Sequence, residues 1–152
     1  MKSLGLLILR LIVGGIFAVH GYPKLFGGPD KPVHPLLAEY LGPGFVQAMQ
    51  NGPGGFRGLL ERLRLPNPER MATFVGGVEF FGGLLLALGL YTRLSALLLS
   101  GDMAVAIGKV HWRNGLVGQG GFELPLSLLG ACLTLLFAGP GKISLARLMG
   151  PW

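Results

Sequence analysis

Residues Leu4–Val19 read LGLLILRLIVGGIFAV, and this stretch decides the fold. The apolar run is broken only by Arg10 and continues through His20 to Tyr22. As a helix, residues 4–22 rise roughly 28 Å at ~1.5 Å per residue, close to the hydrocarbon thickness of a bilayer. A chain of 152 residues has too small a core to cover such a run. We therefore expect a retained transmembrane helix and not a secretory signal, whose apolar part is shorter.

Composition places the chain in the membrane class. Hydrophobic residues make up 51% of the sequence and charged residues only 13%, whereas soluble domains carry about 25% charged residues. The net charge is +6, but the basic residues lie between the apolar runs and not on one soluble face. We therefore expect the lipid bilayer and its anionic head groups as the partner of these charges, and no nucleic acid.

Three more apolar runs follow, at residues 71–91, 94–110 and 122–138. Four such runs predict an all-α membrane protein, a four-transmembrane-helix antiparallel bundle formed by one domain of residues 1–152, with both termini on one side. The long loop 27–70 holds two amphipathic segments, Phe56–Leu65 and Leu36–Met49, the second interrupted at Gly42–Gly44. We expect an amphipathic helix there to lie in the membrane interface. The predicted location is the cell inner (cytoplasmic) membrane, multi-pass, and the excess of Lys and Arg on the loop side weakly favours cytoplasmic loops.

Three ionisable residues fall inside the runs: Arg10, Glu79 and Asp102. A charge at mid-bilayer costs about 2.5–3.5 kcal/mol on insertion scales, so all three are expected to face the bundle interior. The first interpretation is a buried ion network, with Arg10 paired to Glu79 or Asp102, that fixes the register of the helices. Gly76 and Gly83 flank Glu79 on one helix face and are expected to let a partner backbone approach.

The second interpretation is a polar pocket in the loop-side half of the bundle. Arg10, His20 and Lys24 share one face of the first helix if Pro23 does not turn Lys24 away. A histidine or lysine there would donate to a quinone oxygen, and a carboxylate would move protons. The pocket residues expected on this interpretation are His20, Tyr22, Lys24, Glu79, Lys109, His111, Trp112 and Glu123.

Other candidate sites are weaker. His20 and His111 as paired haem ligands have no further support in the sequence, and His34 is expected in solvated loop. The single Cys132 lies in an apolar run, where a buried inert thiol is the usual state, and one cysteine forms no cysteine-based metal site. No nucleotide-binding glycine loop or nucleophile elbow is present. No resident cofactor is therefore predicted beyond a quinone.

Several motifs together resemble the DoxX family of small four-helix bacterial membrane proteins. They cover nearly the whole chain: RLIVGG at 10–15, HGYPKLF at 20–26, VEFFGGLLLALGLYTR at 78–93, ELP at 123–125 and GPGKISL at 139–145. The 27–70 segment looks longer than is usual in the family. Ala146 stands where an Asp often follows the Ser-Leu pair, which leaves a tail carboxylate without support.

The resemblance implies a membrane subunit associated with redox chemistry. One branch of the family is similar to the membrane subunit of thiosulfate:quinone oxidoreductase, and another acts with detoxifying enzymes in oxidative-stress complexes. The leading hypothesis is therefore a quinone-binding membrane subunit of an oxidoreductase assembly, served by other membrane or peripheral redox subunits. The alternative is a non-catalytic structural or assembly subunit of a larger membrane complex. A small transporter is less favoured, because four helices leave little room for alternating access and no inverted repeat is found.

Overall fold

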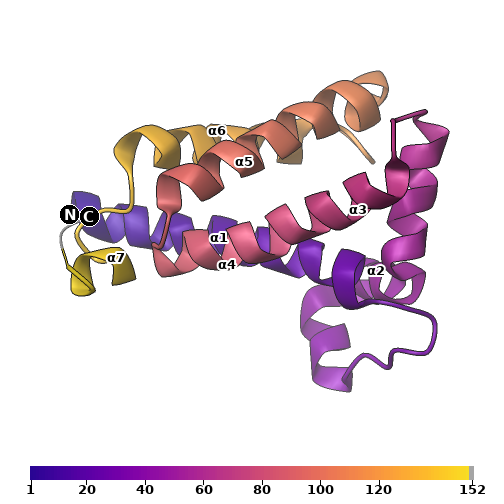
Figure 1. Cartoon of the computed structure of the whole chain (residues 1–152), viewed down its shortest axis with the longest axis horizontal. Coiled ribbons are helices and arrows are strands. Elements are labelled where there is room, and N and C mark those ends of the chain that lie inside the picture. Colours follow the sequence, from indigo (N-terminus) through magenta and orange to yellow (C-terminus); the bar gives the residue numbers. More distant parts are fainter. Residues whose placement is uncertain (151–152) are drawn as a thin grey trace. The chain divides into compact units, whose positions relative to one another are not determined.

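The computed structural model describes residues 1–150, and within that range the chain is helical with no strand. The all-α prediction is therefore confirmed. Figure 1 traces the elements in chain order. They are α1 (Lys2–Phe26), α2 (Pro35–Arg62), α3 (Pro68–Gly77), the π-helical turn η1 (Val78–Gly82), α4 (Gly83–Leu88), α5 (Thr92–Val105), the π-helical turn η2 (Ala106–His111), the 3₁₀ turn η3 (Trp112–Asn114), α6 (Glu123–Ala138) and α7 (Leu145–Leu148).

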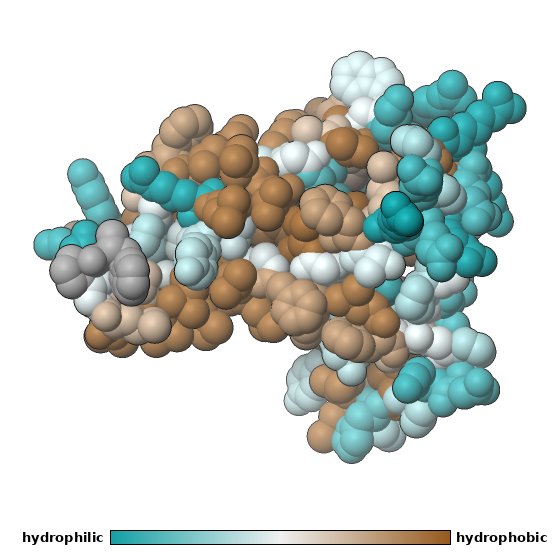
Figure 2. All heavy atoms as spheres, in the orientation of Figure 1, coloured by the Kyte–Doolittle hydropathy of each residue, from teal (hydrophilic) through white to brown (hydrophobic). Residues whose placement is uncertain are grey.

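Three stretches of helix are long and apolar enough to cross a membrane. They are Lys2–Phe26, Pro68–Leu88 and Thr92–Asn114, and the fourth apolar run is the shorter helix Glu123–Ala138. Figure 2 shows apolar side chains gathered on the surface over α5 and α6. Exposed large residues there include Leu97, Leu98 and Phe137. Such a surface is typical of helices that face lipid.

The first helix is longer than predicted. The sequence predicts an end at Tyr22, but α1 runs to Phe26 with Pro23 inside it. Proline removes one backbone hydrogen bond from a helix. The Pro23 carbonyl still accepts from the Gly27 amide at 3.0 Å, which closes the last turn. As a result, Lys24 follows His20 by one turn on the same face.

The chain divides into two compact units, residues 1–17 with 81–152, and residues 18–80. In the first unit, α5 packs beside α6 and against α4. The core includes Phe17, Leu86, Leu99 and Leu135, all almost fully buried. A Cβ on Gly14 would lie 2.9 Å from the Ala87 Cβ, so α1 and α4 are in close contact there.

The second unit contains α2 and α3, which pack against each other. Gly42 (φ 80°) and Gly52 (φ 56°) interrupt the helical path of α2 and divide it into three segments. The predicted interruption at Gly42–Gly44 is confirmed. The Gly28 amide donates to the Met49 carbonyl at 2.7 Å, which ties the end of α1 to the middle of α2. This connection holds the middle of α2 close to the end of α1.

Candidate functional site

The site is built on the last two turns of α1, in the second unit. A Cβ on Gly21 would lie 2.8 Å from the Glu79 Cβ, and one on Gly76 would lie 3.1 Å from the Lys24 Cβ. Because neither glycine has a Cβ, α1 approaches the helix that carries Glu79 closely at both levels. The atoms nearest to Gly76 are side-chain atoms of Lys24 and Leu25, whereas the Gly83 carbonyl oxygen lies against Gly14, so the expected close approach of a partner backbone is found at Gly83. The close approach at Gly21 was not predicted.

Lys24 and Glu79 form an ion pair at this contact. Lys24 Nζ donates to Glu79 Oε1 at 2.6 Å and lies 2.5 Å from Oε2. The Glu79 side chain is 5% exposed and that of Lys24 is 21% exposed. Glu79 sits in the π-helical turn η1. Such turns widen a helix locally and often occur at functional sites.

A third partner completes the surroundings of the ammonium group. Lys24 Nζ lies 4.2 Å from the ring centroid of Phe56 on α2. A cation at this distance over an aromatic face is attracted to it. The ammonium is therefore held from two sides by α2 and by η1, and its aliphatic stem lines the wall of a pocket.

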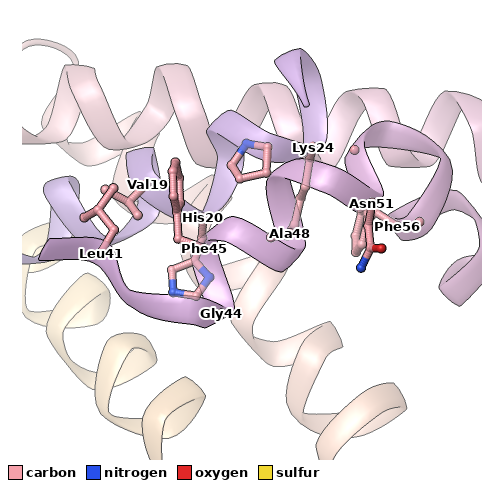
Figure 3. Close-up of a pocket in the computed structure, with 12 residues that line it drawn as sticks. Val19, His20, Lys24, Leu41, Gly44, Phe45, Ala48, Asn51 and Phe56 are labelled. Atoms are coloured by element: carbon pink, nitrogen blue, oxygen red, sulfur yellow. The ribbon is translucent and has the colours of Figure 1, made fainter. Parts of the chain in front are cut away.

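We call this cavity of about 400 Å³ the Lys24 pocket. Its volume is in the range of small-molecule sites. Figure 3 shows how α1 and α2 supply its walls. It is lined by Val19, His20, Pro23, Lys24, Leu41, Gly44, Phe45, Ala48, Asn51, Gly52, Gly55 and Phe56.

The polar groups of the Lys24 pocket are few and close together along α1. His20 and Lys24 are one turn apart, and Asn51 faces the pocket from α2. The remaining walls are apolar or glycine, with the rings of Phe45 and Phe56 among them. An apolar cavity with a few convergent donors suits a flat, mainly apolar ligand that accepts hydrogen bonds at its edge. Glu79 is not a lining residue and acts on the pocket through Lys24.

A second cavity, of about 280 Å³, shares three lining residues with the first: Val19, Leu41 and Phe45. We call it the Tyr22 pocket. Its other lining residues are Ala18, Tyr22, Pro32, Val33, His34, Leu37, Met49 and Phe80. The Tyr22 ring lies 5.1 Å from that of Phe26 and 5.7 Å from that of Phe80, centroid to centroid. Of these three rings, Tyr22 and Phe80 line the Tyr22 pocket.

Four of the eight predicted pocket residues thus lie in this unit: His20, Tyr22, Lys24 and Glu79. His20 and Lys24 line the Lys24 pocket, Tyr22 lines the second cavity, and Glu79 lies behind Lys24. His34, expected in solvated loop, is exposed and caps α2, its Nδ1 accepting from the Leu36 amide at 3.3 Å.

The other four predicted pocket residues lie in the first unit, around the loop before α6. The His111 ring nitrogen Nδ1 is 2.7 Å from the Gly120 carbonyl oxygen. Trp112 stacks on Phe122 with ring centroids 5.5 Å apart. Lys109 and Glu123 are exposed. These contacts order the loop, and a role of the four residues in a ligand site remains a prediction.

Arg10 is fully buried in the first unit. Its Nη2 donates to the Ile143 carbonyl, and a Cβ on Gly89 would collide with the guanidinium. Arg10 therefore joins α1, the turn before α5 and the tail. Asp102 is half-buried in α5. The contacts described for Arg10 and Glu79 are with Ile143 and Lys24, and the ion network of Arg10, Glu79 and Asp102 remains a prediction.

The α2 side of the site was not predicted. Gly44, Ala48 and Gly55 leave room on that wall, while Phe45 and Phe56 supply rings. Gly44 and Ala48 lie in the predicted amphipathic segment Leu36–Met49, which was interpreted only as a membrane-surface helix. Cys132 is buried, as expected. Within residues 1–150 no group of three or more His, Cys, Asp or Glu side chains could hold a metal ion.

Comparison with known proteins gives two findings. Residues 5–112 match the protein family described as DoxX. The chain is also 34% identical, over 150 residues, to the uncharacterised membrane protein Rv3486 of Mycobacterium tuberculosis, with 91% of this chain and 77% of that protein covered. No solved structure matches.

Proposed function

Since the chain belongs to the DoxX family of membrane proteins, we propose that it is the membrane subunit of an oxidoreductase assembly and binds a quinone head group in the Lys24 pocket. The observation that carries this proposal is the meeting of His20 and Lys24, one turn apart, in an otherwise mainly apolar cavity of about 400 Å³. A quinone ring is flat and apolar, and its two oxygens accept hydrogen bonds.

The residues present fit such a head group. Lys24 is a charged donor to one quinone oxygen, and His20 or Asn51 is a donor to an edge of the ring. Phe45 and Phe56 offer aromatic faces for the ring to pack on. Reduction of a quinone to a quinol takes up two electrons and two protons, so the electrons must come from a partner redox subunit or a cofactor bound by that assembly.

Glu79 has a positioning role in this proposal. Its carboxylate accepts a hydrogen bond from Lys24 Nζ at 2.6 Å and so fixes the position of the ammonium group. A charge-assisted hydrogen bond of this kind is stronger than a neutral one. Loss of the carboxylate should therefore weaken ligand binding even though Glu79 itself does not line the pocket.

The membrane arrangement is part of the proposal. We propose that Glu123–Ala138 crosses the membrane as a fourth helix, giving a four-helix antiparallel bundle in the inner membrane. The Lys142 amide donates to Ser3 Oγ at 3.3 Å, so the tail lies beside the start of α1. Chain ends that meet in this way are consistent with an even number of crossings. The α2 segment would lie in the interface, with its arginines toward head groups.

The alternative is a structural or assembly subunit that binds no small molecule. The observation in its favour is that Lys24 and Glu79 already satisfy each other, so the pair could serve only to join helices. The two functions differ in the expected effect of a pocket variant. A structural pair affects stability alone, whereas a binding site affects affinity at unchanged stability.

The test is quinone binding to the purified protein in detergent, measured for wild type, His20→Ala and Asn51→Ala. Both side chains line the pocket without taking part in the ion pair, so the variants are expected to stay folded. The loss of one hydrogen-bond donor should lower the quinone affinity of a variant about tenfold, which corresponds to about 1.4 kcal/mol. This result supports the proposal. An affinity unchanged in both variants, or no saturable binding to wild type, contradicts it and favours the structural subunit.

A further inference from the structure

We propose that the isoprenoid tail of the bound quinone lies in the Tyr22 pocket while the head group lies in the Lys24 pocket. This inference rests on the proposed function. It assigns the second cavity of this unit to the hydrocarbon part of the ligand.

The first argument is adjacency. Val19, Leu41 and Phe45 line both cavities, so the two cavities are neighbours and these three side chains lie between them. All three are apolar. The tail of a head group held at Lys24 has an apolar path in that direction and meets no charged side chain along it.

The second argument is the difference in chemistry between the cavities. The Lys24 pocket has Lys24, His20 and Asn51 among its lining residues, whereas the Tyr22 pocket has apolar walls with only Tyr22 and His34 as polar-tipped residues. The rings of Tyr22, Phe26 and Phe80 lie within 5.1–5.7 Å of one another. Tyr22 and Phe80 line the cavity, and their apolar rings suit contact with a chain of branched hydrocarbon.

The third argument is how the second cavity is formed. Pro32 and Val33 belong to the connection between α1 and α2, and this connection is fixed where the Gly28 amide binds the Met49 carbonyl at 2.7 Å. Gly27 and Gly52 touch at that point, where a Cβ on Gly52 would lie 2.8 Å from the Gly27 carbonyl carbon. The connection is therefore held in place, so the cavity exists before a ligand arrives, which lowers the ordering cost of binding.

In a bilayer or micelle the tail is already out of water, so its contribution comes from packing and not from hydrophobic transfer. Tailed and tail-less ligands also partition differently into detergent. A sound test therefore compares proteins at a fixed ligand. The variant is Val33→Trp, which fills the Tyr22 pocket. The matched control is Leu36→Trp, at an exposed position that lines neither pocket.

The probes are duroquinone, which has no tail, and a farnesylated benzoquinone with a diazirine at the tail end. We expect Val33→Trp to weaken binding of the farnesylated probe about tenfold, the effect of about 1.4 kcal/mol of overpacking, and to leave duroquinone binding within about twofold. Leu36→Trp should change neither. On wild-type protein, light should attach the diazirine to residues lining the Tyr22 pocket, and excess duroquinone should suppress this labelling.

The outcomes separate the two proposals. Weaker duroquinone binding in His20→Ala supports the head-group site. The tail site is overturned if the diazirine labels residues outside the Tyr22 pocket, or if Val33→Trp weakens the binding of both probes equally. Absence of saturable binding of either probe overturns both. The labelling is done on the unaltered protein, so a Val33 variant that fails to fold still leaves the inference open to refutation.

Discussion

The Lys24–Glu79 pair should respond asymmetrically to the loss of one partner. Removal of one member of a buried ion pair destabilises by about 3–5 kcal/mol, because the other charge remains buried without a partner. The Glu79 side chain is 5% exposed and cannot reach solvent, whereas that of Lys24 is 21% exposed. Lys24 also retains the Phe56 ring, 4.2 Å from Nζ.

Lys24→Leu should therefore cost about 3–5 kcal/mol, since it leaves Glu79 buried alone. Glu79→Leu should cost about 2–3 kcal/mol, since the ammonium can turn toward solvent and keep its aromatic partner. The double Leu variant should lie within about 1 kcal/mol of wild type, because replacing both charges of a buried pair by apolar groups is often neutral.

The assay is unfolding by titration with a denaturing detergent, followed by circular dichroism. The matched control is the surface pair Arg57–Glu61, with atoms 3.4 Å apart and side chains 49% and 54% exposed. Glu61→Leu should change stability by no more than about 0.5 kcal/mol. The reasoning is refuted if Glu79→Leu is the more damaging single variant, or if the double variant loses the sum of the single losses.

Three further outcomes concern the glycines and Arg10. Gly21→Ala places a Cβ against Glu79 and should lower the free energy of unfolding by about 1–3 kcal/mol in the same titration. The control Gly54→Ala, with nothing within 4 Å of its Cβ, should be neutral or stabilising. Equal effects of the two variants contradict the packing argument. Gly89→Ala, at φ +74° and against the Arg10 guanidinium, should lower the melting temperature more than Gly54→Ala does. Arg10→Met removes the donor that holds the tail at the Ile143 carbonyl. We expect faster amide hydrogen exchange in residues 143–148 of this variant. Unchanged exchange would show that Arg10 does not hold the tail.

Part of this structure could be predicted from sequence because it depends on local composition. The apolar runs gave the helices α1, α3–α4, α5 and α6, and the Gly-Pro-Gly at residues 42–44 gave the interruption in α2. The predicted first helix ended at Tyr22, but α1 continues through Pro23 to Phe26. One lost hydrogen bond is small beside the packing of Gly21 and Lys24 on the next helix.

The partners of the charges could not be predicted, because they depend on long-range packing. Helical periodicity predicted that Lys24 lies on the same face as His20 and that Glu79 is flanked by small residues. Local sequence does not determine which basic side chain pairs with which acidic one. Lys24 and Glu79 are 55 positions apart in sequence. The contribution of α2 was missed for the same reason, since amphipathic helices on a membrane surface and helices that close a pocket share one pattern.

The most direct measurement is duroquinone binding to the variant Ala48→Phe, which fills part of the Lys24 pocket and leaves both residues of the ion pair in the sequence. Ala104→Phe, at an exposed position of α5 outside either pocket, is the matched control. We predict saturable duroquinone binding to wild type and to Ala104→Phe. Ala48→Phe should lose this binding while keeping the same thermal stability. Equal binding to all three proteins would contradict a head-group site in this pocket.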